Sequence, residues 1–345
     1  METDMRKIIE GFHQQFLFEP VIENEAAWRI NKRDALYNLA EFTVFGMGGS
    51  HLAADIVKYR FPDMHIDIRK DYGLPNIYKT SFLAWPKIFV SHSGNTEEIT
   101  DTLDEALCRA GRMSPLPHLG VISCGGKLLK TAKNHALPYI QIPDTGIPPR
   151  SATAYMTKAL LKMMRRDETY TESAYAELTN LARSLHPEEF ETAGKELAER
   201  MRGKVPIIYA SSRNEVIAQN WKIRLNESGK IPAFYNVFPE LNHNEMNGFI
   251  GNGKAGDLAT PFAFFFLEDE TDHPRIRKRM AILKELYQNN GLTVESVKLE
   301  SGTPFYKLLA SIILADWTSY YTALQYSVEP LPVPTVEEFK KAIVN

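Results

Sequence analysis

Cysteine is scarce in this sequence, and long apolar runs are missing. The chain has 345 residues and only two cysteines, Cys108 and Cys124, which excludes a disulfide framework and indicates a reducing compartment. The most apolar run, residues 261–267, is far shorter than the roughly 20 residues that a transmembrane helix needs. Residues 1–10 are charged and lack the apolar core of a signal peptide. We therefore expect a cytoplasmic protein without a membrane segment.

A block of basic residues is also missing. The net charge is −3, so a nucleic acid would find no electrostatic attraction, and an anionic small molecule would need a local positive site. The hydrophobic content of 44% and the charged content of 24% are typical of globular proteins. The length is sufficient for two α/β units, each with its own buried sheet.

The first half of the chain alternates between short apolar runs and amphipathic stretches. Residues 1–35 are predicted to form an amphipathic helix, with Ile8, Ile9, Phe12 and Phe16 on one face. Strands are then predicted at 42–45, 66–68, 87–90, 119–122 and 139–142, and helices at 52–59, 97–110 and 127–134. Short glycine-rich turns follow several of these strands, which is typical of a parallel sheet covered by helices on both faces.

The second half repeats this alternation. After Pro148-Pro149, Ser151 is a suitable N-cap for a helix through Met164. Later strands are predicted at 205–209, 262–267 and 293–299, and helices at 212–227, 275–287, 307–326 and 335–343. We predict four segments, which are an N-terminal helical segment (1–35), a first subdomain (36–165), a helical connector (166–203) and a second subdomain with a C-terminal helix (204–345).

The turn Gly46-Met47-Gly48-Gly49-Ser50 follows the first predicted strand. A glycine-rich turn at this place lets backbone N–H groups approach a phosphate at the start of the next helix. The dinucleotide fingerprint is excluded because His51 stands where its last glycine is required, and a P-loop is excluded because no GK[ST] follows. A tight structural bend remains an alternative for this turn.

The loop Ser91-His92-Ser93-Gly94-Asn95-Thr96 follows the third predicted strand and precedes a helix that starts with Glu97. Several hydroxyl groups and free N–H groups at a helix start can hold an anion without any lysine. Ligands of open parallel sheets lie beyond the C-terminal ends of the strands. We therefore expect Ser50 to lie beside this loop, although an ordinary N-cap and turn is the alternative.

These two loops, residues 46–50 and 91–98, resemble the SIS (sugar isomerase) domain. Three further motifs, residues 149–151 (PRS), 226–227 (NE) and 239–245 (PELNHNE), make the chain from about residue 36 onward similar to the bifunctional phosphoglucose/phosphomannose isomerases. The resemblance implies two flavodoxin-like α/β subdomains. It also implies conversion of glucose 6-phosphate, and of mannose 6-phosphate as a second substrate, into fructose 6-phosphate.

The resemblance also implies a binding mode for the hexose phosphate. It assigns the phosphate group to Gly48, Gly49, Ser50, Ser91, Ser93 and Thr96. It implies no metal and no organic cofactor, because the reaction needs only acid and base groups. The second predicted subdomain has Ser211-Ser212-Arg213-Asn214 instead of a glycine-rich loop, so we expect one sugar-phosphate site per chain.

Glu227 is the base that the resemblance implies. Isomerisation moves a proton between C1 and C2 through an enediolate, and this requires a base of tuned pKa. Glu227 ends a predicted helix that carries Trp221 and Leu225, and apolar neighbours raise the pKa of a carboxyl group. From the residues alone, a solvated glutamate at a helix end is the alternative.

Three cations complete the implied site. Arg150 precedes a predicted helix start, where a cation is disfavoured unless an anion joins it, and the resemblance makes it the group that stabilises the enediolate. His243 is implied as the acid that opens the sugar ring, acting in the partner subunit's site of a homodimer. Lys340 matches the family's C-terminal lysine, with Lys341 as the alternative. A metal at His243 and Glu245 has little support, because a third ligand at suitable spacing is missing.

Two other functions fit the sequence less well. A sugar-phosphate-binding regulator would carry a DNA-binding segment and a basic patch, and it would have no use for Glu227, His243 and Arg150. An aminosugar isomerase within a glutamine-dependent synthase would need an N-terminal cysteine nucleophile, which residues 1–10 do not contain. The sequence leaves the preference between the two aldose phosphates undecided, because that depends on the pocket's fit to one hydroxyl group.

Overall fold

The computed structural model describes residues 4–28, 41–75, 85–111, 118–164, 170–250 and 257–344 of the chain. The chain divides into two compact units. Residues 11–184 form one, here called the N-terminal unit, and residues 1–10 with 185–345 form the other, the C-terminal unit. Within the predicted connector, helix α7 (Tyr170–Ser184) belongs to the first unit and helix α8 (Glu191–Met201) to the second.

The N-terminal unit is built on a five-stranded parallel sheet. Its strands are β1 (Glu41–Gly46), β2 (His65–Arg69), β3 (Lys87–Val90), β4 (Leu119–Ser123) and β5 (Tyr139–Gln141). Their order is β2-β1-β3-β4-β5, which is the flavodoxin-like order. Every neighbouring pair is parallel, so the predicted fold class is confirmed for this unit.

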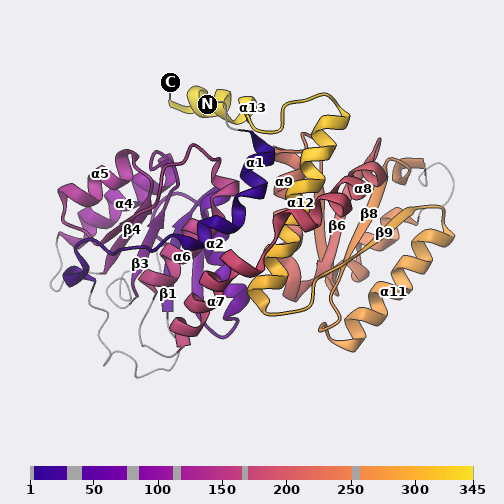
Figure 1. Ribbon diagram of the computed structural model, residues 1–345, viewed down its shortest axis with the longest axis horizontal. Helices are drawn as coiled ribbons and strands as arrows, with labels where there is room; N and C mark the ends of the chain where they lie inside the picture. Colours follow the sequence, from indigo (N-terminus) through magenta and orange to yellow (C-terminus); the bar gives the residue numbers. More distant parts are fainter. Residues whose placement is uncertain are drawn as a thin grey trace. The chain divides into compact units, whose positions relative to one another are not determined.

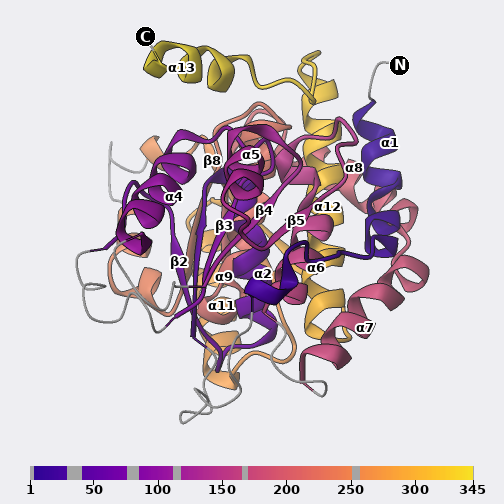
Figure 2. The same cartoon turned by 90° about the vertical axis from the view of Figure 1, so that its left-hand side faces the viewer.

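Helices cover both faces of this sheet. They are α2 (Leu52–Arg60), α4 (Glu97–Ala110), α5 (Gly126–Asn134) and α6 (Thr153–Met163), and α7 packs on α6. Figures 1 and 2 show α4 and α5 together on one side of the sheet, and Figure 1 shows α2 and α6 on the other. Strands β3 and β4 are buried at every position, which explains why they read as continuous apolar runs. On the α4 side, Phe45 and Phe89 stack with their ring centroids 4.9 Å apart.

The helix predicted over residues 1–35 is wrong in its described part. Helix α1 (Met5–Glu10) ends before Gly11, and a 3₁₀ helix, η1 (Phe12–Leu17), follows it. Helix α1 packs against α12 of the C-terminal unit, whereas η1 packs against α6 and α7 of the N-terminal unit. The four apolar residues of the predicted face are buried, but two different cores bury them: Ile8 and Ile9 in one unit, Phe12 and Phe16 in the other. Residues 29–35 lie outside the described residues.

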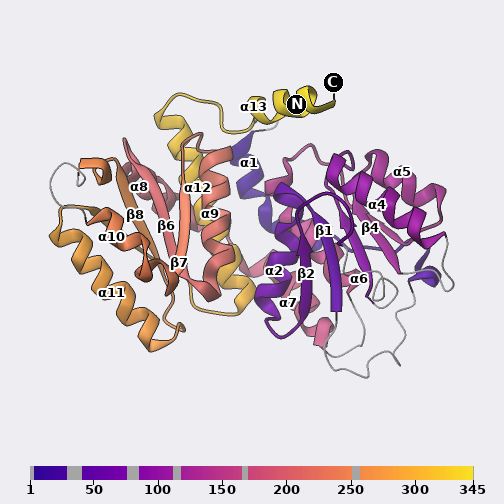
Figure 3. The same cartoon turned by 180° about the vertical axis from the view of Figure 1, so that it is seen from behind.

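The C-terminal unit contains a four-stranded parallel sheet. Its strands are β6 (Val205–Ser211), β7 (Phe234–Phe238), β8 (Phe262–Glu268) and β9 (Thr293–Lys298), in the order β7-β6-β8-β9. Besides α1 and α8, its helices are α9 (Glu215–Glu227), α10 (Glu245–Phe249), α11 (Pro274–Asn289), α12 (Pro304–Gln325) and α13 (Pro334–Val344). Figure 3 shows α10 and α11 on one side of this sheet, and α9 and α12 on the other.

Strand β7 was not predicted from the sequence. It is an edge strand in which only Phe238 is fully buried, so it lacks the apolar run that marks the central strands. The second sheet repeats the first four positions of the first sheet's order, which confirms two copies of one architecture. In the described ranges no helix is long and apolar enough to cross a membrane.

Candidate active site

Strands β1 and β3 are neighbours in the first sheet, and the strand order reverses between them. Loops that leave such a pair of strands diverge and open a crevice at the C-terminal edge of the sheet, where ligands of this fold class bind. The turn η4 (Gly48–Ser50) follows β1, and residues 91–96 follow β3. The backbone N–H of His92 donates to Ser50 Oγ at 3.0 Å. The predicted proximity of Ser50 to the second loop is therefore observed.

Hydroxyl groups organise the loop at residues 91–96. Ser91 Oγ and Thr96 Oγ1 are hydrogen-bonded at 2.8 Å, and Ser91 Oγ also accepts from the Gly94 N–H at 3.1 Å. The Ser93 hydroxyl accepts from the Asn95 N–H at 3.3 Å. Helix α4 begins directly after the loop, and the partial positive charge of a helix start favours an anion at this place.

Two glycines allow loops at this edge of the sheet to approach each other. A Cβ atom on Gly94, whose φ is +70°, would lie 1.8 Å from the Gly125 carbonyl oxygen. A Cβ atom on Gly49 would lie 2.7 Å from the Arg150 nitrogen and 2.7 Å from the Pro149 carbonyl carbon. Real Cβ atoms essentially never come within 3.0 Å of a neighbour. The turn that carries Arg150 is therefore packed directly onto the turn that carries Ser50.

Arg150 is buried, with 2% of its surface exposed. It lies in a 3₁₀ turn, η5 (Pro149–Ser151), and α6 begins only at Thr153. The predicted N-cap role of Ser151 is wrong, because Ala152 holds that position. Ser151 is buried, and its hydroxyl has no hydrogen-bond partner in the described part of the chain. Arg150 is thus a buried cation on a turn whose backbone packs against the Gly48–Ser50 turn.

His92 does not add a second charge to this loop. Burial lowers its pKa, while the carboxylate of Asp144 acts in the opposite direction. Its Nε2 atom is buried and has no hydrogen-bond partner among the described residues. The predicted residues Gly48, Gly49, Ser50, Ser91, Ser93, Thr96 and Arg150 are thus all in the N-terminal unit, on segments that follow β1, β3 and β5.

Glu227 is the last residue of α9, in the C-terminal unit. Side chains fix the chain that leaves this helix: Asn226 Nδ2 donates to the Ile231 carbonyl at 3.0 Å, and Lys230 Nζ donates to the Glu227 carbonyl at 2.5 Å and to the Pro332 carbonyl. Trp221 in the same helix is fully buried. A half-buried carboxylate at the end of a well-anchored helix is suited to a task that demands fixed geometry.

Arg224 anchors the same helix one turn earlier. Its Nε atom lies 2.8 Å from Asp316 Oδ1 on α12, and both side chains are buried. Its Nη1 atom donates to Asn220 Oδ1 at 2.7 Å. Because a buried ion pair is costly to break, this contact holds α9 against α12 and limits movement of Glu227.

His243 and Lys340 lie on two other elements of the C-terminal unit. His243 ends the 3₁₀ turn η8 (Glu240–His243) and is exposed to solvent. Lys340 lies on α13 with 64% of its side chain exposed, and its Nζ bonds to Glu337 Oε1 at 3.0 Å. His243 and Glu245 belong to no metal-binding group, because the described residues contain no cluster of three or more suitable ligands.

The second sheet has its own reversal of strand order, between β6 and β8. Acidic side chains occupy this position. Ser211 Oγ donates to Asp272 Oδ1 at 2.8 Å, and Asn214 Nδ2 donates to Asp269 Oδ2 at 3.1 Å. Lys307 Nζ donates to both oxygens of Asp269, at 2.6 and 2.7 Å. All five side chains are buried.

This acidic cluster explains why the two reversal points differ chemically. At the first, hydroxyl and N–H groups offer hydrogen bonds to an anion. At the second, the carboxylates of Asp269 and Asp272 already accept hydrogen bonds from the chain's own donors. Their negative charge would repel a phosphate. The cluster was not found from the sequence, although the run Glu268-Asp269-Glu270-Thr271-Asp272 after a strand was an available signal.

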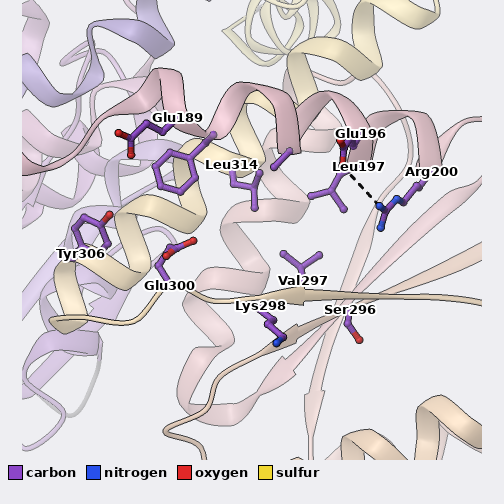
Figure 4. Close-up of a pocket in the computed structure, with 12 residues that line it drawn as sticks. Glu189, Glu196, Leu197, Arg200, Ser296, Val297, Lys298, Glu300, Tyr306 and Leu314 are labelled. Atoms are coloured by element: carbon purple, nitrogen blue, oxygen red, sulfur yellow. Dashed lines mark ion pairs between the residues drawn. The ribbon is translucent and has the colours of Figure 1, made fainter.

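A separate pocket of about 410 Å³ lies in the C-terminal unit, among α8, β9 and α12 (Figure 4). Leu197, Val297 and Leu314 form its apolar wall, and Arg200 pairs with Glu196 at its rim. None of the residues predicted from the sequence lines this pocket. It is therefore not the predicted phosphate site.

Comparison with known proteins agrees with the geometry. Residues 190–343 match the family model described as the bacterial phospho-glucose isomerase C-terminal SIS domain. A bifunctional phosphoglucose/phosphomannose isomerase of Aquifex aeolicus is 29% identical over 344 residues, which are 99% of this chain and 98% of that protein. Over nearly its whole length, this chain is similar to the bifunctional phosphoglucose/phosphomannose isomerases. The resemblance stated from the motifs is thereby confirmed.

Two further comparisons define the breadth of this relationship. A D-glucosamine-6-phosphate 4-epimerase of Sulfolobus acidocaldarius is 31% identical over 205 residues, covering 59% of this chain and 61% of that protein. A crystal structure of a hypothetical protein from Thermus thermophilus superposes with a TM-score of 0.69 at 16% identity, covering 98% of this chain and 92% of the other. The last comparison shows a shared fold.

Replacing Gly49 by alanine is expected to weaken phosphate binding. The new Cβ atom would meet the Pro149–Arg150 backbone at 2.7 Å and would push the Ser50 turn and the Arg150 turn apart. We expect at least about tenfold weaker binding, equivalent to roughly 1.4 kcal/mol, in calorimetric titration with fructose 6-phosphate. Gly125→Ala is the control, because a Cβ atom there meets nothing within 4 Å. Unchanged affinity of Gly49→Ala would place the phosphate elsewhere.

Asp269→Asn is expected to destabilise the C-terminal unit in a pH-dependent way. Burial alone would raise the pKa of Asp269, but Lys307 and the Thr271 N–H hold it at about 2, below its usual 3.8. The carboxylate therefore stabilises the fold above about pH 4, by roughly 2 kcal/mol, and this contribution disappears as the pH falls towards 2. In urea unfolding, the substitution should lower the free energy of unfolding strongly at pH 7 and only slightly at pH 3. The exposed neighbour variant Glu270→Gln should behave as wild type at both pH values.

Proposed function

We propose that this protein is an aldose–ketose isomerase that interconverts glucose 6-phosphate, and also mannose 6-phosphate, with fructose 6-phosphate. The observation that carries the proposal is the packing of the buried Arg150 turn on the Gly48–Ser50 turn, which in turn is hydrogen-bonded to the hydroxyl-bearing loop at 91–96 after the neighbouring strand β3. Similarity to the Aquifex aeolicus isomerase over 99% of the chain supports the same conclusion.

The phosphate of the sugar binds at the C-terminal edge of the first sheet, where β1 and β3 end. Its oxygens accept hydrogen bonds from the hydroxyl groups and N–H groups of two turns, which are contributed by Gly48, Gly49, Ser50, Ser91, Ser93 and Thr96. The internal bonds of Ser91 with Thr96, and of Ser50 with the His92 N–H, support this assignment because they orient the hydroxyls before the ligand arrives. Such preorganisation reduces the entropy lost on binding.

Glu227 transfers the proton. Its carboxylate removes the C2 proton of the open-chain aldose, and the electrons form the C1–C2 double bond of an enediolate while the carbonyl oxygen becomes negatively charged. Arg150 stabilises that charge. The proton then returns from Glu227 to C1 while the O2 proton passes to the negatively charged O1, which leaves a carbonyl at C2 and a hydroxyl at C1, so no proton is gained or lost overall. Mannose 6-phosphate differs from glucose 6-phosphate only at C2, which is the carbon that becomes planar in the enediolate.

His243 opens the sugar ring by donating a proton to the ring oxygen, assisted by Lys340. We propose that His243 does so in the partner subunit's site of a homodimer. Its exposure at the end of η8 supports this arrangement, because an exposed side chain can reach into a second subunit. The reaction requires no metal or organic cofactor, and we place the enzyme in the cytoplasm, as the scarcity of cysteine suggests.

Glu227→Gln tests the proposed base. An amide cannot accept the C2 proton, so kcat for glucose 6-phosphate should fall by at least about 100-fold, while the affinity for inorganic phosphate stays within about twofold. A coupled assay with both aldose phosphates, and with glucosamine 6-phosphate to include the 4-epimerase chemistry, measures this. Wild-type turnover by the variant would eliminate Glu227 as the base. Turnover of glucosamine 6-phosphate alone would replace the proposed substrate.

A mixture of two inactive variants tests the shared site. If His243 serves the partner's site, a dimer of one Glu227→Gln subunit and one His243→Ala subunit contains one intact site. Random subunit exchange should then restore about one quarter of the wild-type activity. Each variant alone, subjected to the same exchange, is the control. Failure to restore activity in mixed dimers that have been verified by mass spectrometry would place His243 and Glu227 of the same chain in one site.

A further inference from the structure

The turn that carries His243 is attached to the second sheet through one carboxylate. Glu245, two residues beyond His243, is the first residue of α10, which lies on one side of that sheet (Figure 3). Its Oε1 accepts from Tyr209 Oη at 2.5 Å, and its Oε2 accepts from Asn236 Nδ2. Tyr209 on β6 and Asn236 on β7 are partners in the strand register. One side chain therefore joins the His243 turn to two neighbouring strands.

The tyrosine of this anchor is fully buried. Tyr209 has no exposed surface, and its ring packs against those of Phe238, Phe264 and Phe266 at centroid distances of 6.0, 5.5 and 5.4 Å. Burial raises the pKa of Tyr209, and Tyr287 and Glu245 raise it further, so the hydroxyl remains a donor. A buried hydroxyl without an acceptor is costly, and Glu245 is the acceptor here.

Contacts on both sides of His243 hold the remainder of the turn. Leu241 is fully buried in the aromatic core beneath it. Asn244 Oδ1 accepts from the Glu245 N–H at 2.6 Å, and Asn244 Nδ2 donates to Glu240 Oε1 at 3.2 Å. His243 is exposed between two anchored positions, so its backbone is restrained while its imidazole faces solvent.

We propose that Glu245 is a positioning residue for His243. The residue type matters, because a carboxylate accepts at both oxygens whereas an amide accepts at one and donates at the other. Tyr209 and Asn236 both donate, so only a carboxylate satisfies the pair. The proposal rests on the proposed function, in which His243 opens the sugar ring.

Glu245→Gln separates positioning of the ring-opening acid from other effects. The assay compares glucose 6-phosphate with 5-deoxy-fructose 6-phosphate, which lacks the C5 hydroxyl and cannot form the furanose ring. We expect kcat for glucose 6-phosphate to fall about tenfold with KM within about twofold, and kcat for the open-chain analogue to stay at the wild-type value. His243→Ala should give the same pattern with a larger loss.

Two further variants act as control and rescue. Glu240→Gln makes the same chemical change at an exposed position of the same turn; the amide oxygen can still accept from Asn244 Nδ2, the donor that Glu240 accepts from, so both activities should be unchanged. Tyr209→Phe combined with Glu245→Gln removes one of the two donors, so that the amide oxygen can accept from Asn236. The double variant should therefore lose less activity than the product of the two single losses.

Hydrogen exchange over residues 240–249 gives a readout that is independent of turnover. Glu245→Gln should accelerate exchange there, and Glu240→Gln should not. Equal losses on both sugars, or wild-type activity of Glu245→Gln on glucose 6-phosphate, would overturn the positioning role. If the wild-type protein turned over neither sugar, the proposed function and the role of His243 would fall together, and the exchange rates would still decide whether Glu245 anchors the turn.

Discussion

The contact between Gly49 and the Pro149–Arg150 backbone is the constraint on which the candidate phosphate site depends. A Cβ atom at Gly49 would lie 2.7 Å from the Arg150 nitrogen, so the two turns can be this close only because Gly49 has no side chain. This contact brings the turn that carries the buried Arg150 onto the turn that follows β1, next to the point where the strand order reverses. It also links two segments that are about 100 residues apart in the chain.

The two sheets show how one topology can present opposite chemistry at the same place. Both reverse their strand order between the first and third strands of the unit. The loop after β3 contains hydroxyls and glycines, whereas the loop after β8 contains Asp269 and Asp272, whose carboxylates bind Lys307, Asn214 and Ser211. The first therefore has hydroxyl groups that can donate to an anion, whereas the carboxylates of the second already accept from the chain's own groups. In the C-terminal unit, the proposed base Glu227 and the proposed acid His243 lie instead at a helix end and in a turn.

Several elements could be predicted because local signals and tertiary packing agree in them. The apolar runs of β3 and β4 are buried on both faces, and α4 has the predicted limits, Glu97–Ala110. Other elements could not be predicted, because distant contacts override local preference. The 1–35 segment divides at Gly11, since the residues on either side pack into different units. Edge strand β7 lacks the pattern of a buried strand.

The sequence by itself determined the alternation of strands and helices, the glycine and serine loops, and the resemblance that named a reaction. These are properties of neighbouring residues, such as periodicity, turn chemistry and motif order. Only the tertiary structure decided that Arg150 is buried against Gly49, that Asp269 and Asp272 occupy the second reversal point, and that Glu245 holds the His243 turn to Tyr209 and Asn236. Each of these depends on a contact between residues from different elements, which local sequence does not specify.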